Sequence, residues 1–247
     1  MCWYGVLTAL VAAAGAAGAQ RPEVAVSAAA SLTDVLQQVA DVYEGRFGER
    51  VALNVGASNT LARQIAAGAR VDVFVSADEA QMDAVSRYID PASRIALVSN
   101  QLAIAVPDDR PRRFASAREL ADPAVRRIAL GDPAAVPAGV YAKAYLQALG
   151  VWDALASKIV PVGSVRLALA AVEHGAVDAA VVYRTDIGHT RRVRAALIVP
   201  AHEGPRIVYP AAMVRDAPNP AGARRFIAFL QTDDAAAVFA RAGFLRP

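Results

Sequence analysis

The chain is poor in the side chains that cysteine and metal chemistry require. Its 247 residues include one cysteine, Cys2, and three histidines. Cys2 precedes the apolar run of the N-terminal segment, whereas a lipoprotein signal places its cysteine after that run. The sequence therefore excludes an internal disulfide and, once the N-terminal segment is removed, cysteine catalysis or thiolate-bound metal. His174, His189 and His202 lie in separate polar stretches and show no metal-ligand spacing.

Familiar catalytic and nucleotide-binding motifs are also missing. There is no G-x-G-x-x-G run and no Walker loop, and Ser164 does not stand in a G-x-S-x-G nucleophile elbow. Aspartates 72, 78, 178 and 186 could pair as carboxylates across a cleft, but aspartates that follow glycine turns or open helices more often stabilise turns and caps. The sequence therefore predicts a protein that is not an enzyme and has no cofactor.

Positive charge is present but dispersed. The formal net charge is +3, and lysine is rare, with only Lys143 and Lys158. The arginines include four pairs, Arg112-Arg113, Arg126-Arg127, Arg191-Arg192 and Arg224-Arg225. A nucleic-acid surface would concentrate such charge and interleave it with aromatic residues. We expect solvated helix and loop faces, and no nucleic-acid partner.

The first twenty residues contain no charged side chain. The apolar run Val6–Val11 is followed by alanines and glycines, and Ala17-Gly18-Ala19 fits a small-x-small cleavage pattern before Gln20. This is typical of a secretory signal peptide over residues 1–19, although no lysine or arginine stands near Met1. No other segment is long and apolar enough to span a bilayer. The sequence predicts export to the periplasm.

Strand and helix signals alternate along the rest of the chain, which predicts an α/β fold. The segment 68–75 resembles the segment 175–182, and each follows a predicted helix and leads into a polar cluster. This echo favours two lobes of similar build. Apolar segments 101–106 and 206–214 could join them, with Pro107 and Pro210 at strand ends or crossovers. We predict one lobe from residues 20–103 and 211–247, and the other from 104–210.

Four predicted helices begin with small or hydroxyl residues directly after a strand. Ser31 follows the predicted strand Glu23–Ser27, and Ser58 follows Val51–Val55. Two further helix starts lie at 131–141, around Pro137, Ala138 and Gly139, and at 162–166, around Ser164 and Val165. Ala138 and Gly139 should allow a close approach of backbone to a ligand. Free N–H groups and the positive helix end would hold an anion there without a charged side chain.

Each of these residues also has an ordinary structural interpretation. A single serine at a helix start is more often an N-cap, and Ser31 with Asp34 has the spacing of a capping box. Tyr183 ends a predicted buried strand, where a tyrosine is more often a core residue with a satisfied hydroxyl. Four helix starts together, with small residues around them, weaken the interpretation as ordinary caps.

Five segments of the chain resemble, in the same order, segments of the periplasmic molybdate-binding proteins of ABC transporters. They are residues 28–33, 58–65, 72–78, 131–142 and 181–183. The resemblance covers nearly all of residues 22–247. It implies a two-lobed, type II periplasmic-binding-protein fold with two crossover strands and the ligand in the interlobe cleft. It also implies a monomer that captures molybdate or tungstate and delivers it to a membrane permease.

The resemblance also implies a set of ligand residues. Ser31 and Ser58 would bind the oxyanion through hydroxyl and backbone N–H, Ala138 and Val165 through backbone N–H, and Tyr183 through its hydroxyl. They would contact the metal only through its oxo groups. Asn59 stands where a second serine is common in this family, and Arg184-Thr185 follows the tyrosine; neither departure removes a donor. Alternative ligands are sulfate, another oxyanion or a small organic acid, and the alternative class is a secreted hydrolase.

Overall fold

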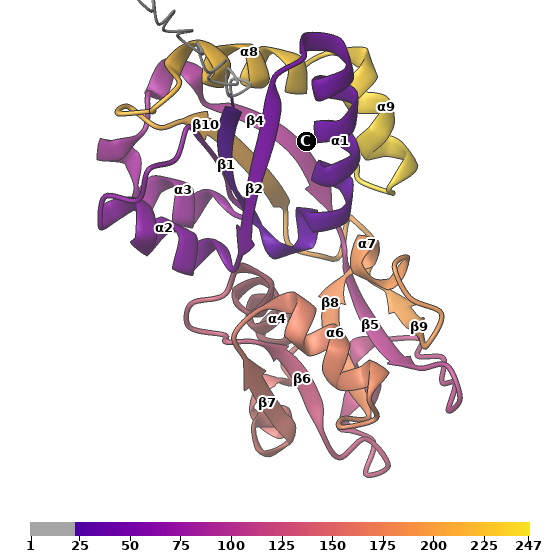
Figure 1. Ribbon diagram of the computed structural model, residues 1–247. Coiled ribbons are helices and arrows are strands. Elements are labelled where there is room, and N and C mark those ends of the chain that lie inside the picture. Colours follow the sequence, from indigo (N-terminus) through magenta and orange to yellow (C-terminus); the bar gives the residue numbers. More distant parts are fainter. Residues whose placement is uncertain (1–22) are drawn as a thin grey trace, which may run out of the picture.

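The computed structural model describes residues 23–247, so the predicted signal peptide lies outside the described residues. The chain forms two α/β lobes, one above the other in Figure 1, and each is built on a five-stranded sheet. This confirms the predicted fold class. None of the helices described is both long enough and apolar enough to cross a bilayer.

The first lobe contains one sheet with the strand order β2-β1-β3-β10-β4. Its strands are β1 (Glu23–Ala29), β2 (Arg50–Gly56), β3 (Val73–Val75), β4 (Ile95–Asn100) and β10 (Ile207–Met213). Its helices are α1 (Thr33–Phe47), α2 (Ser58–Ala66), α3 (Glu79–Ala84), α8 (Pro220–Leu230) and α9 (Asp233–Arg241), with 3-10 turns at Ala30–Leu32, Ser86–Tyr88 and Pro91–Ser93. Strands β1, β2 and β3 run parallel, and β10 runs antiparallel to β3 and β4.

The second lobe repeats this plan with the strand order β7-β6-β8-β5-β9. Its strands are β5 (Leu102–Pro107), β6 (Ile128–Gly131), β7 (Ile159–Val162), β8 (Ala179–Tyr183) and β9 (Val193–Ile198). Its helices are α4 (Pro137–Ala148), α5 (Trp152–Leu155), α6 (Val165–Glu173) and α7 (Arg184–Ile187), with 3-10 turns at Ala117–Ala121 and Ala156–Lys158. Strands β3 and β8, which carry the two echoing sequences, occupy the same central place in their sheets.

The chain passes between the sheets twice. The first passage lies between Asn100, the end of β4, and Leu102, the start of β5. The second lies between the end of β9 at Ile198 and the start of β10 at Ile207. The predicted boundaries after residues 103 and 210 fall inside β5 and β10, so the change of sheet comes slightly earlier each time. Lobe 1 below means residues 23–100 and 207–247, and lobe 2 means residues 102–198.

Two local predictions are wrong. Pro210 does not end a strand: it lies inside β10, which is an interior strand, at a register shift between Tyr209 and Pro210. A bulge tolerates proline because no ladder hydrogen bond is needed from its nitrogen there. The Ser31–Asp34 capping box is also absent, since neither the 3-10 turn nor α1 has a side-chain cap. Asp34 instead points across to lobe 2, as described below.

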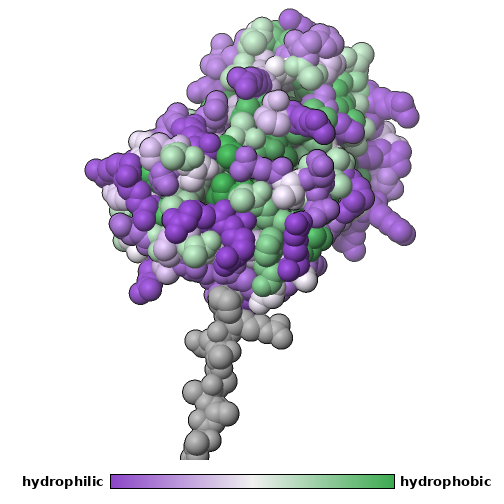
Figure 2. Space-filling model, turned by 90° about the horizontal axis from the view of Figure 1, so that it is seen from above, coloured by the Kyte–Doolittle hydropathy of each residue, from purple (hydrophilic) through white to green (hydrophobic). Residues whose placement is uncertain are grey.

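The cores follow the predicted periodicity with small shifts. On α1 the residues Val35, Leu36, Val39 and Tyr43 are buried as expected, while Val42 is exposed and Ala40 takes its place. Hydrophilic residues cover most of the surface seen from the lobe 1 end, with apolar residues as patches between them (Figure 2). Apolar burial is therefore concentrated within the two lobes, where it provides the main stabilisation of each sheet.

Candidate functional site

A small cavity lies between the lobes where six parallel strands end. The carboxyl ends of β1, β2 and β3 lead into it from lobe 1, and those of β6, β7 and β8 lead into it from lobe 2. Ligands of open α/β sheets bind at such strand ends, because the helices that follow begin there. The cavity is lined by Ala29, Ala30, Ser31, Ala57, Ser58, Ala77, Val136, Pro137, Ala138, Ser164, Val165 and Tyr183.

All five residues predicted to hold the ligand line this one cavity, although they lie on five separate segments of the chain. None of the lining residues carries a charge. The cavity volume is about 20 Å³, whereas drug-sized ligands occupy pockets of about 300–1,000 Å³. In this conformation the site therefore suits a ligand of a few atoms that is recognised by neutral groups.

The two serines from lobe 1 are not helix caps. The N-cap of α2 is Ala57, and Ser58 makes no capping hydrogen bond. Instead, the Ser58 hydroxyl oxygen accepts a hydrogen bond from the Ala77 N–H at 3.0 Å. Ser31 lies in the 3-10 turn before α1, and its hydroxyl is 3.1 Å from the Tyr209 hydroxyl. Both serines are buried, so the ordinary capping interpretation does not hold for either.

Lobe 2 contributes two helix starts. Pro137 occupies the first turn of α4, and Ser164 caps α6 by accepting from the Leu167 N–H at 3.2 Å. The first N–H groups of a helix have no intrahelical acceptor. In the described part of the chain, no acceptor is found for the N–H groups of Ala138 and Val165. The positive ends of α4 and α6 thus direct free donors toward the cavity.

A close contact between two glycines positions the start of α4. A β-carbon on Gly139 would lie 1.8 Å from the carbonyl oxygen of Gly131, the last residue of β6. We expected Gly139 to permit an approach of backbone to ligand, but it does not line the cavity; the close approach is to the strand end. Only glycine allows this contact, which sets the position of the neighbouring Ala138 N–H.

Tyr183, at the end of β8, has the most unusual environment in the site. Its side chain is buried, and its hydroxyl has no hydrogen-bond partner among the described residues. Burial raises the pKa of this phenol well above its usual value, and nearby Tyr209 and Tyr141 raise it further. The hydroxyl therefore stays protonated. A buried polar group without a partner is costly, which is expected where a ligand completes the hydrogen bonding.

The four aspartates have the common roles. Asp72 accepts from the Ala25 and Asn219 N–H groups, Asp78 caps α3 through the Gln81 N–H, and Asp178 accepts from the Arg126 and Arg127 N–H groups. Asp186 accepts from the Tyr183 N–H at 3.0 Å and so fixes the backbone of that residue. None of them lines the cavity, so the structure offers no carboxylate pair there for hydrolysis.

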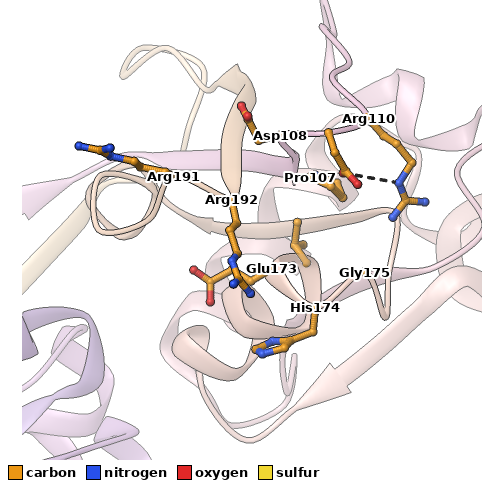
Figure 3. Close-up of a pocket in the computed structure, with 10 residues that line it drawn as sticks. Pro107, Asp108, Arg110, Glu173, His174, Gly175, Arg191 and Arg192 are labelled. Carbon is orange, nitrogen blue, oxygen red and sulfur yellow. Dashed lines mark ion pairs between the residues drawn. The ribbon is translucent and has the colours of Figure 1, made fainter.

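A larger hollow, of about 580 Å³, lies at the end of the second sheet that is remote from the interlobe cavity. Its lining includes Asp108, Arg110, Glu173, His174 and Arg192, which are drawn as sticks in Figure 3. Three of the four arginine pairs adjoin this end, since they precede β6 and β9 or follow β5. The side chains of these arginine pairs are mostly exposed, as predicted. Acidic and basic side chains both line the hollow. It shares no residue with the interlobe cavity.

An ion-pair cluster joins the lobes beside the cavity. The Arg166 guanidinium on α6 lies 2.5 Å from the Asp34 carboxylate on α1 and 3.3 Å from the buried Asp186 carboxylate. His189 lies 3.3 Å from Asp34. Burial lowers the pKa of His189, with Arg166 lowering it further, so the ring is mainly neutral at pH 7. Arg166 is then the charged link between the lobes.

Comparison with known proteins gives consistent results. The family model for bacterial extracellular solute-binding proteins matches residues 24–245. The molybdate-binding protein ModA of Escherichia coli (strain K12) is 37% identical over 244 residues, which cover 94% of this chain and 93% of that protein. The solved periplasmic molybdate-binding protein of Azotobacter vinelandii is 26% identical with a TM-score of 0.81, covering 91% of this chain and 99% of that one. The substrate-binding domain of a putative molybdenum ABC transporter from Clostridium difficile is 28% identical, with a TM-score of 0.71 and the same coverage.

Proposed function

This chain belongs to the family of bacterial extracellular solute-binding proteins, and we propose that it captures molybdate outside the cytoplasm for an ABC transporter. Relatives named as molybdate-binding proteins match it over nearly their whole length. The family and these relatives bind solutes, so the chain is a binding protein and not an enzyme. Molybdate is its ligand, and binding requires no cofactor.

One observation supports molybdate most strongly: a small cavity with no charged lining receives neutral donors from both lobes. Hydroxyls of Ser31 and Ser58 face it from lobe 1. The N–H groups of Ala138 and Val165 and the Tyr183 hydroxyl face it from lobe 2. A tetrahedral oxyanion has four oxygens that each require a donor once water is removed. Hydrogen bonds from neutral donors to an ionised acceptor are strong, and the helix ends add attraction.

The same donors account for selectivity. A site that presents only donors leaves the proton of hydrogen phosphate without an acceptor, and an unsatisfied buried polar group is costly. Sulfate carries no proton at neutral pH, so cavity size must exclude it. Tungstate has nearly the size and charge of molybdate, and we expect both to bind. The metal contacts the protein only through its oxo groups.

The remaining features of the proposal concern transport. Because the donors come from two lobes, the complete site exists only when the lobes are closed, and the ligand should shift the population toward that form. The closed form is the state that a membrane permease can recognise. We expect a monomer that is exported to the periplasm by the signal peptide, residues 1–19, which is then removed.

Calorimetric titration tests this function. The mature chain, residues 20–247, is titrated separately with molybdate, tungstate, sulfate and phosphate at neutral pH. We expect one-to-one binding of molybdate and tungstate, and far weaker binding of sulfate and phosphate. Comparable affinity for sulfate would make the protein a general oxyanion carrier. If none of the four anions binds, the proposal is refuted.

A further inference from the structure

The Ser31 hydroxyl has a buried neighbour that the sequence patterns did not single out. Tyr209 lies on β10, just after the second passage between the lobes, and its side chain is fully buried. The Tyr209 and Ser31 hydroxyl oxygens are 3.1 Å apart. That distance alone does not say which hydroxyl donates, and the direction decides what Ser31 can offer to a ligand.

Asn100 determines the direction. Its side-chain oxygen accepts from the Gln101 backbone N–H at 2.9 Å, which fixes the orientation of the amide. The amide nitrogen then faces Thr185 Oγ1 at 2.9 Å and the Tyr209 hydroxyl oxygen at 3.4 Å. An amide NH₂ group only donates, so the Tyr209 oxygen is the acceptor in this contact. The proton of Tyr209 is then directed to its other partner, Ser31.

Resting on the proposed function, we propose that Asn100 and Tyr209 are positioning residues that make the Ser31 hydroxyl a donor toward the bound oxyanion. Ser31 accepts a hydrogen bond from the Tyr209 hydroxyl and directs its own O–H group into the cavity that it lines. Hydrogen bonds that run in one direction along a chain strengthen each other. Asn100, which lies at the first passage between the lobes, therefore determines through Tyr209 that Ser31 donates to the ligand.

Ser58 shows the same arrangement with a different donor. Its hydroxyl oxygen accepts from the Ala77 backbone N–H at 3.0 Å, so its proton is also left for the cavity. Both lobe 1 serines thus have an acceptor position occupied by the protein. The donor at Ser58 is a backbone N–H, which no substitution other than proline removes. The donor at Ser31 is a side chain, which makes the direction of its hydrogen bonds open to experiment.

The arrangement has a consequence for selectivity. A serine hydroxyl that rotates freely can accept a hydrogen bond as well as donate one. If Ser31 could turn its proton toward Tyr209, it would offer an acceptor to hydrogen phosphate. The Tyr209 O–H group blocks that orientation. Because the Tyr209 oxygen accepts from the Asn100 amide, its proton points to Ser31 and occupies the space that the Ser31 proton would need. Asn100 and Tyr209 therefore increase the preference for an oxyanion without a proton.

The test is a double-substitution cycle on the mature chain with Ser31→Ala, Tyr209→Phe and both together. Affinities for molybdate are measured by calorimetry, and affinities for phosphate by competition against molybdate. Loss of one hydrogen bond in a network corresponds to about a two- to ten-fold change. We expect Tyr209→Phe to weaken molybdate binding by this factor and to weaken phosphate binding less. In the Ser31→Ala background, Tyr209→Phe should have no further effect.

Two further variants separate this role from a purely structural one. Tyr43→Phe is the matched control, because the buried Tyr43 hydroxyl donates to Glu49 at 2.5 Å within lobe 1 and away from the cavity; it should lower thermal stability and leave the molybdate-to-phosphate ratio unchanged. Asn100→Asp replaces the donor to Tyr209 with an acceptor and should lower that ratio further. The affinities are measured above neutral pH, where inorganic phosphate is almost entirely the dianion, so that the added charge repels both ligands alike and repulsion leaves the ratio unchanged.

The outcomes distinguish the two proposals. If the unsubstituted protein binds molybdate but Tyr209→Phe leaves the ratio of affinities unchanged, or acts equally with and without Ser31, the positioning role is refuted. If the unsubstituted protein binds none of the oxyanions, the proposed function itself fails. A reduced ratio that depends on Ser31 supports both.

Discussion

The two lobes share one topology but supply the site with different kinds of donor. Lobe 1 supplies the serine hydroxyls, each already engaged as an acceptor by a protein donor. Lobe 2 supplies backbone N–H groups at two helix starts and the Tyr183 hydroxyl, which has no partner among the described residues. The first half-site is therefore ordered without the ligand, whereas the second leaves a buried group that only the ligand satisfies.

The difference separates affinity from stability. Removing a lobe 1 hydroxyl takes a donor from the ligand and an acceptor from the protein, so both binding and folding should weaken. Removing the Tyr183 hydroxyl takes a donor from the ligand alone and relieves an unsatisfied buried group. Substitutions in the two half-sites should thus differ in the ligand-free protein even where they reduce affinity similarly.

The largest effect is expected for Ser58→Ala. It removes a hydrogen bond to a charged ligand, worth about 1.5–3 kcal/mol, or roughly 10- to 150-fold in Kd. It also leaves the buried Ala77 N–H without its acceptor, so the ligand-free protein should melt earlier. Calorimetry and thermal denaturation measure the two effects. Normal binding together with early melting would assign Ser58 a structural role only.

Ser31→Ala should reduce molybdate affinity as Ser58→Ala does, but with a smaller loss of stability. The Tyr209 proton loses its acceptor, but the hydroxyl keeps the hydrogen bond from Asn100 and can rotate. The Ala77 N–H in Ser58→Ala is fixed backbone and loses its acceptor, so the loss of stability should be smaller in Ser31→Ala while the loss of affinity is comparable. The same two measurements apply. Equal loss of melting temperature in both variants would contradict the different roles assigned to their hydrogen-bond partners.

Tyr183→Phe is the counterpart in lobe 2. We expect affinity to fall by about ten-fold or more through the lost bond to the anion. The melting temperature of the ligand-free protein should stay the same or rise, because a buried hydroxyl without a partner is removed. A clear fall in that melting temperature would show that the hydroxyl is satisfied in the folded protein, and the contrast between the lobes would be lost.

Asp186 makes lobe 2 sensitive to pH. Burial raises its pKa to about 7, although Arg166 and the hydrogen bond from Tyr183 lower it. In the unfolded chain the carboxyl titrates near its usual value of about 4. Between these values the folded state binds more protons, so its stability falls as pH rises from about 4 to about 7.

Asp186→Asn tests this dependence and keeps an acceptor for the Tyr183 N–H. We expect the free energy of unfolding to decline less steeply with pH over that window in the variant. Urea denaturation at a series of pH values measures it. An identical slope in the variant and the unsubstituted protein would remove Asp186 as the source.

The smallest effect concerns the contact between the lobes. Asp34→Asn breaks the link to Arg166 and leaves Arg166 beside Asp186; the side chains of Arg166 and Asp34 are 26% and 43% exposed. Partly exposed ion pairs contribute about 0.2–1 kcal/mol, so molybdate affinity should fall by less than about five-fold. Small-angle scattering should show a larger radius of gyration for the ligand-free variant if the pair favours closure. An unchanged radius and affinity would limit Arg166 to a local role beside Asp186.

Much of this arrangement follows from sequence-local signals. Alternating strand and helix patterns predict both sheets, and the small residues before Ser31 and Ser58 mark the strand ends that meet at the cavity. The contact of Ser31 with Tyr209 could not be predicted, because it joins residues 178 positions apart. Its direction depends on Asn100, a residue that no local pattern singles out.

The errors have related causes. Asp34 has the spacing of a capping residue, but a long-range contact with Arg166 takes its carboxylate. Pro210 reads as a strand end, yet a bulge admits it to an interior strand. Gly139 reads as space for a ligand, although its missing β-carbon makes room for the carbonyl of Gly131. In each case a tertiary contact overrode a local preference.

A crystal structure of the mature protein with molybdate, located by the anomalous scattering of molybdenum, tests the account most directly. We predict the anion between the lobes, with its oxygens about 2.7–3.1 Å from donors of both half-sites: the hydroxyls of Ser31, Ser58 and Tyr183, and the N–H groups of Ala138 and Val165. No charged side chain should contact it. An anion bound by one lobe only, or through an arginine, would contradict the account.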